Sequence, residues 1–185
     1  TGRRYSCVVP GWEIHKNGGK IMKKILADGT IKYQNEDGRL HRTDGPVYDY
    51  GNGTRAWCRD GKFHRTDGPA VERADGAREW YQDGKLHRAD GPAVERTDGM
   101  RVWWVDGKLH RTDGPAIEHT DGYRAWWVDG KLHRTDGPAV QRADGSREWY
   151  LAGKPHRTDG PAVERADGTR AWYEDGKFIK MEEKS

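Results

Sequence analysis

The sequence predicts an all-β fold, an elongated repeat protein of consecutive antiparallel β-hairpins. Three observations lead to this prediction. One phrase, HRTDGPAVERADG at residues 64–76, recurs with small changes at a constant 23-residue interval over residues 37–174. Short segments such as PAVER and REWYQ are separated by Asp-Gly pairs, which are strong hairpin signals because glycine accepts a positive φ. No long stretch shows the helical period of apolar residues.

The repeats divide the chain into three parts. Six full units of 23 residues span 37–174, and Ala152 replaces the Asp that opens the other units. Residues 1–36 are expected to form a degenerate N-terminal capping segment, in which residues 28–33 resemble the end of an earlier unit with one extra residue. Residues 175–185 are expected to form a truncated repeat that caps the C-terminal end.

Cross-strand charges select the register of the second turn in each unit. We expect two strands and two turns per unit, joined by a His-Arg-x-Asp-Gly-Pro segment. A two-residue Asp75-Gly76 loop would place Arg73 opposite Arg78, whereas a three-residue loop with a left-handed glycine places Glu72 opposite Arg78. The same shift produces the pairs Asp49–Arg55, Glu95–Arg101, Glu118–Arg124, Gln141–Arg147 and Glu164–Arg170. The sequence therefore predicts a three-residue turn with a bulge.

The apolar residues of the chain are few and large. Hydrophobic residues make up 33% and charged residues 34%, yet there are nine Trp and eight Tyr, and disordered chains are poor in aromatic residues. One Trp recurs per unit, and the next position is mostly aromatic, so both sheet faces are expected to carry aromatic rows. We expect Trp80 opposite Ala70, and we expect the recurring tryptophans to stack into one spine.

The net charge of +3 is unevenly placed. Residues 1–36 hold seven basic and three acidic residues (+4), whereas residues 37–174 hold 23 basic and 24 acidic residues (−1). A nucleic-acid-binding domain usually has a basic surplus, which the repeats lack. No run approaches the ~20 apolar residues of a membrane span. Cys7 and Cys58 form no paired-cysteine motif, which fits a reducing compartment, and a cytoplasmic location is expected.

The order of residues within a unit points to a known repeat. It contains an aromatic residue, Asp-Gly-Lys, His, Gly and a second Asp-Gly, here Trp80, Asp83-Gly84-Lys85, His87, Gly91 and Asp98-Gly99. Over about 37–180 this resembles MORN (membrane occupation and recognition nexus) repeats. The chain departs from them where Arg88-Ala89-Asp90 separates His87 from Gly91 and Pro92 follows.

The resemblance implies an elongated antiparallel sheet of consecutive hairpins that serves as a scaffold or interaction module, with lipid binding proposed for some members. A single twisted sheet and a β-solenoid both remain open for this chain. The segment WYxDG also resembles the choline-binding repeats of bacterial surface proteins, but those are shorter and lack the His-Arg-x-Asp-Gly-Pro segment.

A His, an Arg and an Asp recur in every unit, and six equal copies favour a structural role over a catalytic one. A metal row is disfavoured, because repeats two strands apart are separated by roughly 9–10 Å and ligands of one zinc lie ~2 Å from it. We expect each His to bond a turn carbonyl or its neighbouring Asp, and each Arg to pair with an Asp and fix the turn before Pro. The residues assigned to repeat structure are His64, Arg65, Asp67, Trp80, His87, Arg88, Asp90 and Trp103.

The expected function is that of a non-enzymatic protein-interaction scaffold or binding module, such as an inhibitor, an immunity protein or a structural assembly component. No catalytic, cofactor-binding or metal-binding residue is expected. Differences between units suggest where a protein partner binds, and the candidates are Trp104, His119, Tyr123 and Trp127. The alternative is binding of anionic lipid or nucleic acid through the Arg rows and residues 1–36. Open sheet edges add homo-oligomers as a further expectation.

Overall fold

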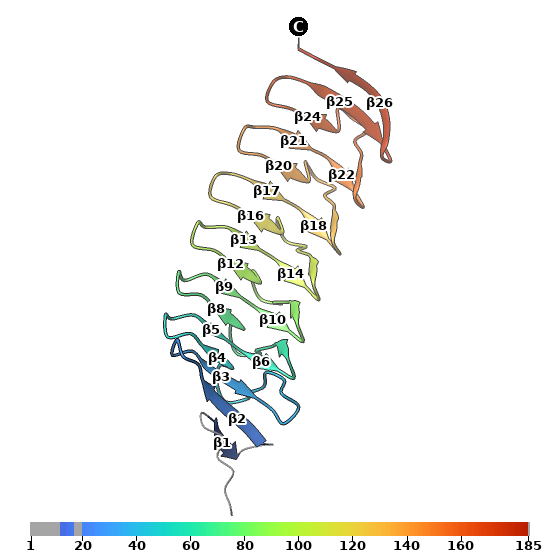
Figure 1. Cartoon of the computed structure of the whole chain (residues 1–185). Coiled ribbons are helices and arrows are strands. Elements are labelled where there is room, and N and C mark those ends of the chain that lie inside the picture. Colours follow the sequence, from blue (N-terminus) through green and yellow to red (C-terminus); the bar gives the residue numbers. More distant parts are fainter. Residues whose placement is uncertain (1–11, 17–19, 185) are drawn as a thin grey trace, which may run out of the picture. The chain divides into compact units, whose positions relative to one another are not determined.

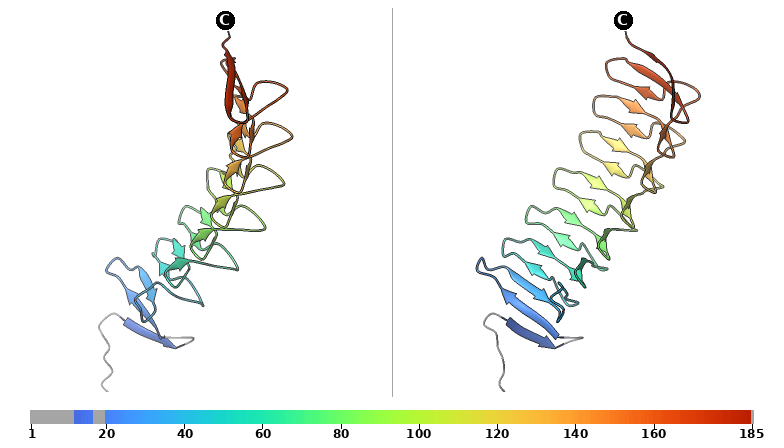
Figure 2. Two further views of the ribbon diagram at one scale, coloured as in Figure 1. Left: turned by 90° about the vertical axis from the view of Figure 1, so that its right-hand side faces the viewer. Right: turned by 45° about the vertical axis from the view of Figure 1, so that its right-hand side comes forward.

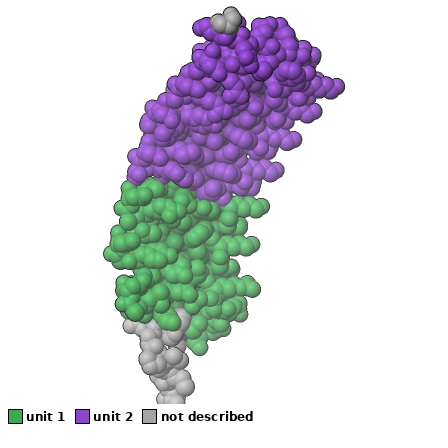
Figure 3. Space-filling view, turned by 45° about the horizontal axis from the view of Figure 1, so that its top comes forward, with its two compact units in different colours: residues 1–85 green, residues 86–185 purple. Residues whose placement is uncertain are grey.

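The computed structural model describes residues 12–16 and 20–184 of the chain. These residues form β-strands joined by turns and loops, with no helix among them (Figure 1). The described part of the chain accordingly has no helix that could cross a membrane. The protein divides into two compact units, residues 1–85 and 86–185 (Figure 3). The division falls inside the third 23-residue repeat, 83–105.

The described residues of the first unit form an antiparallel sheet and a separate hairpin. In spatial order, the sheet strands are β1 (Trp12–Lys16), β2 (Lys20–Ile25), β3 (Ile31–Gln34), β4 (Tyr48–Asp49), β5 (Arg55–Ala56), β8 (Val71–Glu72) and β9 (Arg78–Glu79). The hairpin pairs β6 (Cys58–Arg59) with β7 (Lys62–Phe63). The next strands along the chain are β10 (Tyr81–Gln82) and β11 (Lys85–Leu86), where the two units divide.

The second unit repeats this plan. In spatial order, its sheet strands are β12 (Val94–Glu95), β13 (Arg101–Val102), β16 (Ile117–Glu118), β17 (Arg124–Ala125), β20 (Val140–Gln141), β21 (Arg147–Glu148), β24 (Val163–Glu164), β25 (Arg170–Glu174) and β26 (Lys177–Glu182). Figure 2 shows its separate hairpins beside these strands, and they are β14 (Trp104–Val105) with β15 (Lys108–Leu109), β18 (Trp127–Val128) with β19 (Lys131–Leu132), and β22 (Tyr150–Leu151) with β23 (Lys154–Pro155).

The prediction of an all-β protein of consecutive antiparallel hairpins is confirmed, but a repeat contains four short strands rather than two. The expected continuous strand is divided at its first aromatic residue, as at Trp103 between β13 and β14. Trp103 donates its N–H to Ala116 O in the next repeat at 2.8 Å, and its carbonyl accepts from His110 N–H at 3.2 Å. One residue thus links the main sheet to the hairpin, and each repeat adds two strands to the sheet.

The two Asp-Gly pairs of a repeat form different turns. Asp60 and Gly61 have φ values of 52° and 81° and connect the paired residues Arg59 and Lys62, as in a two-residue type I′ hairpin. In the second turn, Arg73 N–H donates to Ala77 O at 2.9 Å and Gly76 has a φ of 92°. This is the predicted three-residue loop with a left-handed glycine, and the predicted pairing of Glu72 with Arg78 is confirmed.

The same register holds in the other repeats, where the observed pairs are Asp49–Arg55, Glu95–Arg101, Glu118–Arg124, Gln141–Arg147 and Glu164–Arg170. Cross-strand charge pairing therefore predicts the turn correctly. The side chains of these acids do not all pair with the residue opposite them, however. Asp49 lies 3.6 Å from Arg55, whereas Glu72 pairs with the loop residue Arg65 at 3.2 Å.

The core of the sheet is thin. Small residues that follow each Gly-Pro pair are fully buried, namely Val47, Ala70, Ala93, Ala116, Ala139 and Ala162. Val47 is the largest fully buried side chain among the described residues. The main sheet is therefore stabilised by many shallow contacts rather than by one deep apolar centre, which fits a chain with 33% hydrophobic residues.

Candidate functional site

The recurring Arg of each repeat is held between an aromatic ring and a glycine. The Cζ atom of Arg65 lies 4.0 Å from the ring centre of Trp57. On the other side, a Cβ at Gly68 would lie 3.0 Å from the same Cζ atom, so a side chain there would collide with the guanidinium. The same arrangement recurs in the second unit as Trp103–Arg111–Gly114, Trp126–Arg134–Gly137 and Trp149–Arg157–Gly160. This contact explains why glycine precedes proline in the repeat.

The donors of this Arg fix the loop before Pro. Arg65 donates Nε to Asp67 Oδ1 at 2.9 Å, and its Nη1 donates to Pro69 O and to Glu72 Oε1, each at 3.2 Å. The hydrogen bond from Arg65 lowers the pKa of the exposed Asp67 carboxyl. The prediction that Arg and Asp pair within a unit is confirmed.

The expected spine of stacked tryptophans is wrong. A guanidinium group lies over the rings of Trp57, Trp103, Trp126 and Trp149. At the C-terminal end Lys180 Nζ takes this place, 4.1 Å from the ring centre of Trp172. The physical reason is spacing. Equivalent residues of successive repeats are two strands, or about 9–10 Å, apart, whereas stacked aromatic rings lie roughly 4.5–7 Å apart.

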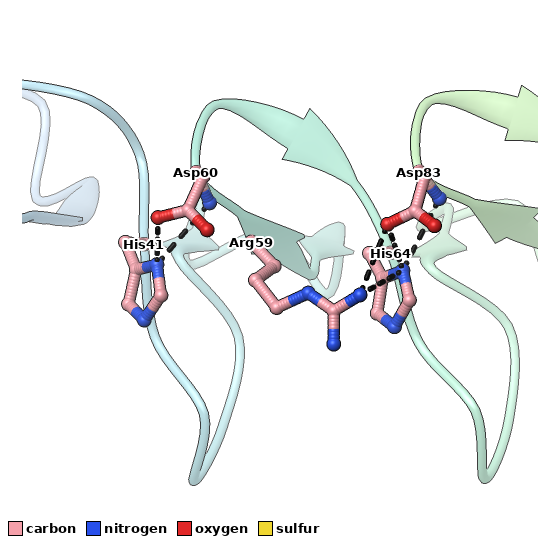
Figure 4. Close-up of polar contacts among 5 residues, drawn as sticks. All are labelled: His41, Arg59, Asp60, His64 and Asp83. Carbon is pink, nitrogen blue, oxygen red and sulfur yellow. Dashed lines mark hydrogen bonds and ion pairs between the residues drawn. The ribbon is translucent and has the colours of Figure 1, made fainter. Parts of the chain in front are cut away.

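The recurring His contacts the next repeat rather than its own turn. His64 Nδ1 accepts the backbone N–H of Asp83 at 3.1 Å and lies 3.0 Å from Asp83 Oδ1 (Figure 4). Arg59 Nη2 also donates to Asp83 Oδ1 at 3.0 Å, and this bond is the main cause of the lowered pKa of Asp83. The expected partner, a turn carbonyl or the neighbouring Asp, is wrong, because the Asp lies 19 residues further along the chain.

This contact supports a strained turn residue. Asp83 has a φ of 49°, which is uncommon for a residue with a side chain, and the His fixes its N–H. Equivalent contacts in the second unit are His87–Asp106, His110–Asp129 and His156–Asp175. Ala152 is the exception, since His133 accepts its N–H at 3.2 Å and no carboxylate accompanies it. The His therefore joins consecutive repeats, which is a structural role.

Grooves lie between consecutive His-Arg-x-Asp-Gly-Pro loops. One in the first unit has a volume of about 580 Å³ and is lined by residues including Asp44, Trp57, Arg59, His64 and Asp67. A second, of about 480 Å³, repeats these positions in the second unit with Leu151 in place of Arg59. Arg65, His64 and Arg59 each bond a carboxylate of the repeats themselves, so the groove is lined by groups that already have partners.

The two faces of the main sheet differ in chemistry. The loop face carries the Trp57–Arg65 stack and Glu72, under the His-Arg-x-Asp-Gly-Pro loops. We call the other side, which carries Glu79 and Tyr81, the reverse face. There Arg73 Nη2 donates to Glu79 Oε1 at 2.7 Å and Tyr81 Oη donates to Glu79 Oε2 at 3.0 Å.

The same Arg–Glu–Tyr triad recurs as Arg142, Glu148 and Tyr150, with distances of 2.8 and 3.1 Å. Burial, together with the hydrogen bond to the carboxylate, raises the pKa of Tyr150 to about 12. Between the two triads in sequence, Val102 and Ala125 replace the Glu, and Trp104 and Trp127 replace the Tyr. The indole Nε1 of Trp127 is buried without a hydrogen-bond partner. Sequence reasoning missed these triads, although Tyr81 and Tyr150 each follow a Glu by two residues, whereas Trp104 and Trp127 each follow an apolar residue.

The four candidate partner-binding residues are all half-buried. Trp104 and Trp127 occupy the same position in adjacent repeats and pair with Leu109 and Leu132 across their hairpins. His119 and Tyr123 lie on either side of a three-residue turn, where His119 N–H donates to Tyr123 O at 3.0 Å. His119 Nδ1 also lies 2.9 Å from Asp121 Oδ1.

The repeat architecture rests on the structure itself. No protein-family model matches the chain, and no curated protein matches it either. What the geometry establishes is an antiparallel β-hairpin repeat protein in which the most regular residues bind one another.

Proposed function

We propose that the chain is a non-enzymatic protein-binding module built from divergent MORN-like repeats. The proposed binding surface is the reverse face of the second unit at Trp104 and Trp127, whose repeats carry the buried Val102 and Ala125 where the triads carry Glu. Its partner is a protein that presents apolar side chains at the contact.

One observation carries this proposal, namely the replacement of the polar triad by apolar groups in two adjacent repeats. Where Glu148 binds Arg142 and Tyr150, the reverse face is internally satisfied. At Ala125 and Trp127 no carboxylate is present, and the half-buried tryptophan supplies a rigid aromatic surface. Trp is among the residues most enriched at binding hot spots. The loop face is a weaker candidate, because its Arg and Asp side chains pair within the repeats.

The MORN-like assignment is supported by the order of aromatic residue, Asp-Gly-Lys and His in each unit and by the hairpin that this order forms. The His-Arg-x-Asp-Gly-Pro segment is the divergent part. Its Arg lies on the aromatic ring and its Gly makes room for that Arg.

Affinity capture from native lysate, with and without nuclease, tests the proposal when a matched variant is included. The variant carries His119→Arg, Ala125→Glu and Trp127→Tyr, which converts one repeat to the triad that Arg142, Glu148 and Tyr150 already form. The control carries Glu148→Ala and Tyr150→Trp, the reverse conversion one repeat further on. We expect one protein to be recovered with the native chain and the control, and at least tenfold less with the variant. Equal recovery by all three would contradict the proposed surface.

Binding of anionic lipid or nucleic acid is the alternative, and the Arg row supports it poorly. Each Arg in that row donates to the Asp two residues later, and Arg111, which donates to Asp113, also lies over the ring of Trp103. Recovery that requires nucleic acid and falls steeply with salt would favour this alternative.

Homo-oligomer formation is a separate possibility, and β26 supports it. This strand ends the sheet order of the second unit and exposes Phe178, Ile179 and Met181, each more than half accessible. An exposed edge strand is a template for pairing with another chain. A mass that halves on Ile179→Lys substitution in light scattering would support a dimer through β26, and a monomeric native chain would exclude it.

A further inference from the structure

Acidic and basic residues alternate along the loop face of the second unit. Reading across the paired strands, the residues opposite one another are Glu95, Arg101, Glu118, Arg124, Gln141, Arg147, Glu164, Arg170 and Glu182. We call this row the charge ladder. A carboxylate lies between successive arginines at every step but one, because Gln141 stands where the pattern requires an acid.

The carboxylates of the ladder have a second role. Glu118 Oε1 accepts Nη1 of the loop residue Arg111 at 3.0 Å, and Glu164 Oε1 accepts Nη1 of Arg157 at 3.0 Å. Each of these acids thus accepts from the loop Arg above it, and it also stands in register with an arginine on either side. The site that surrounds each acid is built to hold one carboxylate group.

Arg134 has the same position in its repeat, but Gln141 replaces the Glu whose carboxylate accepts from the loop Arg elsewhere. Its Cζ lies 3.9 Å from the ring centre of Trp126, its Nε donates to Asp136 at 2.8 Å, and its Nη1 donates to Pro138 O at 3.2 Å. Within the described chain it makes no ion pair or hydrogen bond with residue 141. The arginine is therefore held in place by three contacts, and its fourth contact is missing.

Three arginines of the sheet and the loop flank Gln141. Arg124 and Arg147 are exposed and pair in register with Gln141 from its two sides, and Arg134 approaches from the loop with its side chain 20% exposed. Guanidinium donors form a planar fork that matches a carboxylate, and partial burial reduces screening by solvent. The position of Arg134 is already fixed, so little side-chain entropy is lost on binding.

We propose that the loop face at Gln141 is an anion-binding site, where Arg134 binds a carboxylate group supplied by a ligand and the exposed Arg124 and Arg147, in register with Gln141, add positive charge beside it. A carboxylate is the favoured anion because the equivalent arginines, Arg111 and Arg157, already hold one at 3.0 Å. The ligand carboxylate accepts from Arg134 Nη1 beside the amide of Gln141. The site does not depend on the proposed partner surface, which lies on the reverse face.

Titration of the full chain with acetate, followed by the NMR signals of the arginine Nε–H groups at constant ionic strength, tests the site without any partner protein. We expect saturable shifts at Arg134 and not at Arg111 or Arg157. The Gln141→Glu variant supplies the carboxylate internally, so acetate binding should weaken at least tenfold. The Glu118→Gln variant removes a carboxylate from the ladder, so a second saturable site should arise at Arg111. Glu164→Gln should do the same at Arg157 and replaces Glu118→Gln if that variant does not fold.

Two results would overturn the proposal. The first is acetate binding at Arg134 that is unchanged by Gln141→Glu, or shifts that are equal at all loop arginines. The second is saturation by inorganic phosphate but not by acetate, which would assign the site to a different anion. Failure of the capture experiment with the reverse-face variant leaves both of these measurements unaffected.

Discussion

Trp126 and Trp127 are neighbours in the chain but belong to opposite faces of the sheet. Trp126 lies under Arg134, donates its N–H to Ala139 O at 2.8 Å and accepts His133 N–H at 3.0 Å. Trp127 packs in the hairpin opposite Leu132, and its indole N–H is buried without a partner. Both tryptophans are half-buried, but Trp126 contacts the loop Arg and the next repeat, whereas Trp127 contacts its own hairpin.

The difference teaches which positions are set by the fold. The Trp126 position is Trp in all six full repeats, and its contacts involve the ring, the backbone and the loop Arg together. The Trp127 position holds Cys, Tyr or Trp, and the residue two places earlier is Ala, Val or Glu. The loop-face residues are therefore those that the repeat fold requires. The reverse-face residues can differ between repeats without loss of the fold.

Removing the loop-face ring should have the largest effect. Trp126→Ala deletes the surface on which Arg134 lies, and we expect a loss of about 3 kcal/mol in the free energy of unfolding. Trp127→Phe keeps an aromatic ring and removes the unpaired indole N–H, so its loss should stay below about 1 kcal/mol. Urea denaturation of both variants checks the difference, and equal losses would contradict the distinction between the two faces.

Adding one methyl group to the loop face tests how tightly the Arg is held. A Cβ at Gly114 would lie 2.9 Å from Arg111 Cζ, so Gly114→Ala should destabilise by about 2 kcal/mol. The clash needs the guanidinium. In an Arg111→Ala background, the added cost of Gly114→Ala should therefore shrink by at least about 1 kcal/mol in a double-mutant cycle. Strictly additive losses would mean that Arg and Gly do not act through this contact.

A polar reverse face should be easier to perturb than an apolar one. Glu148→Ala leaves Arg142 and the hydroxyl of Tyr150 without their carboxylate, and we expect a loss of about 1–1.5 kcal/mol. Adding Tyr150→Phe removes the orphaned hydroxyl and should recover part of this loss. Thermal unfolding of the single and double variants measures it, and a larger loss in the double variant would show that the triad is not the relevant unit.

Cross-strand charge pairing predicted the second turn, because a one-residue change in the loop alters which charges face each other. The partner of Arg65 was also predictable, since Asp67 lies two residues away and local geometry limits the choice. The partner of His64 was not, because Asp83 reaches it only through the type I′ turn of the next repeat. The one unit that lacks the Asp, at Ala152, leaves its partner His133 unchanged, so variation between the units does not reveal the pairing.

The division of a strand at Trp103 was hidden for another reason. An alternating sequence pattern predicts which face of the sheet a side chain occupies. It does not predict which strand the backbone of that residue pairs with. The loop Arg over the ring is likewise not evident from the sequence, because a recurring tryptophan fits stacking of the rings as well as a contact with a cation. The candidate residues Trp104, His119, Tyr123 and Trp127 stay a prediction, since exposure alone does not identify a partner.

The smallest effect should come from the one hairpin turn that lacks its Asp. Ala152 has a φ of 49°, and an L-residue in this region is strained by roughly 1–2 kcal/mol. Ala152→Gly removes that strain but increases the entropy of the unfolded chain, so we expect a net gain of about 0.5 kcal/mol. Ala166 lies in a three-residue loop of the same unit without a positive φ, and Ala166→Gly should instead lose about 0.5–1 kcal/mol. Thermal unfolding measures both variants. A gain in stability for Ala152→Gly together with a loss for Ala166→Gly would locate the strain in the type I′ turn. A loss in both variants would mean that the contact of His133 with the Ala152 N–H already relieves it.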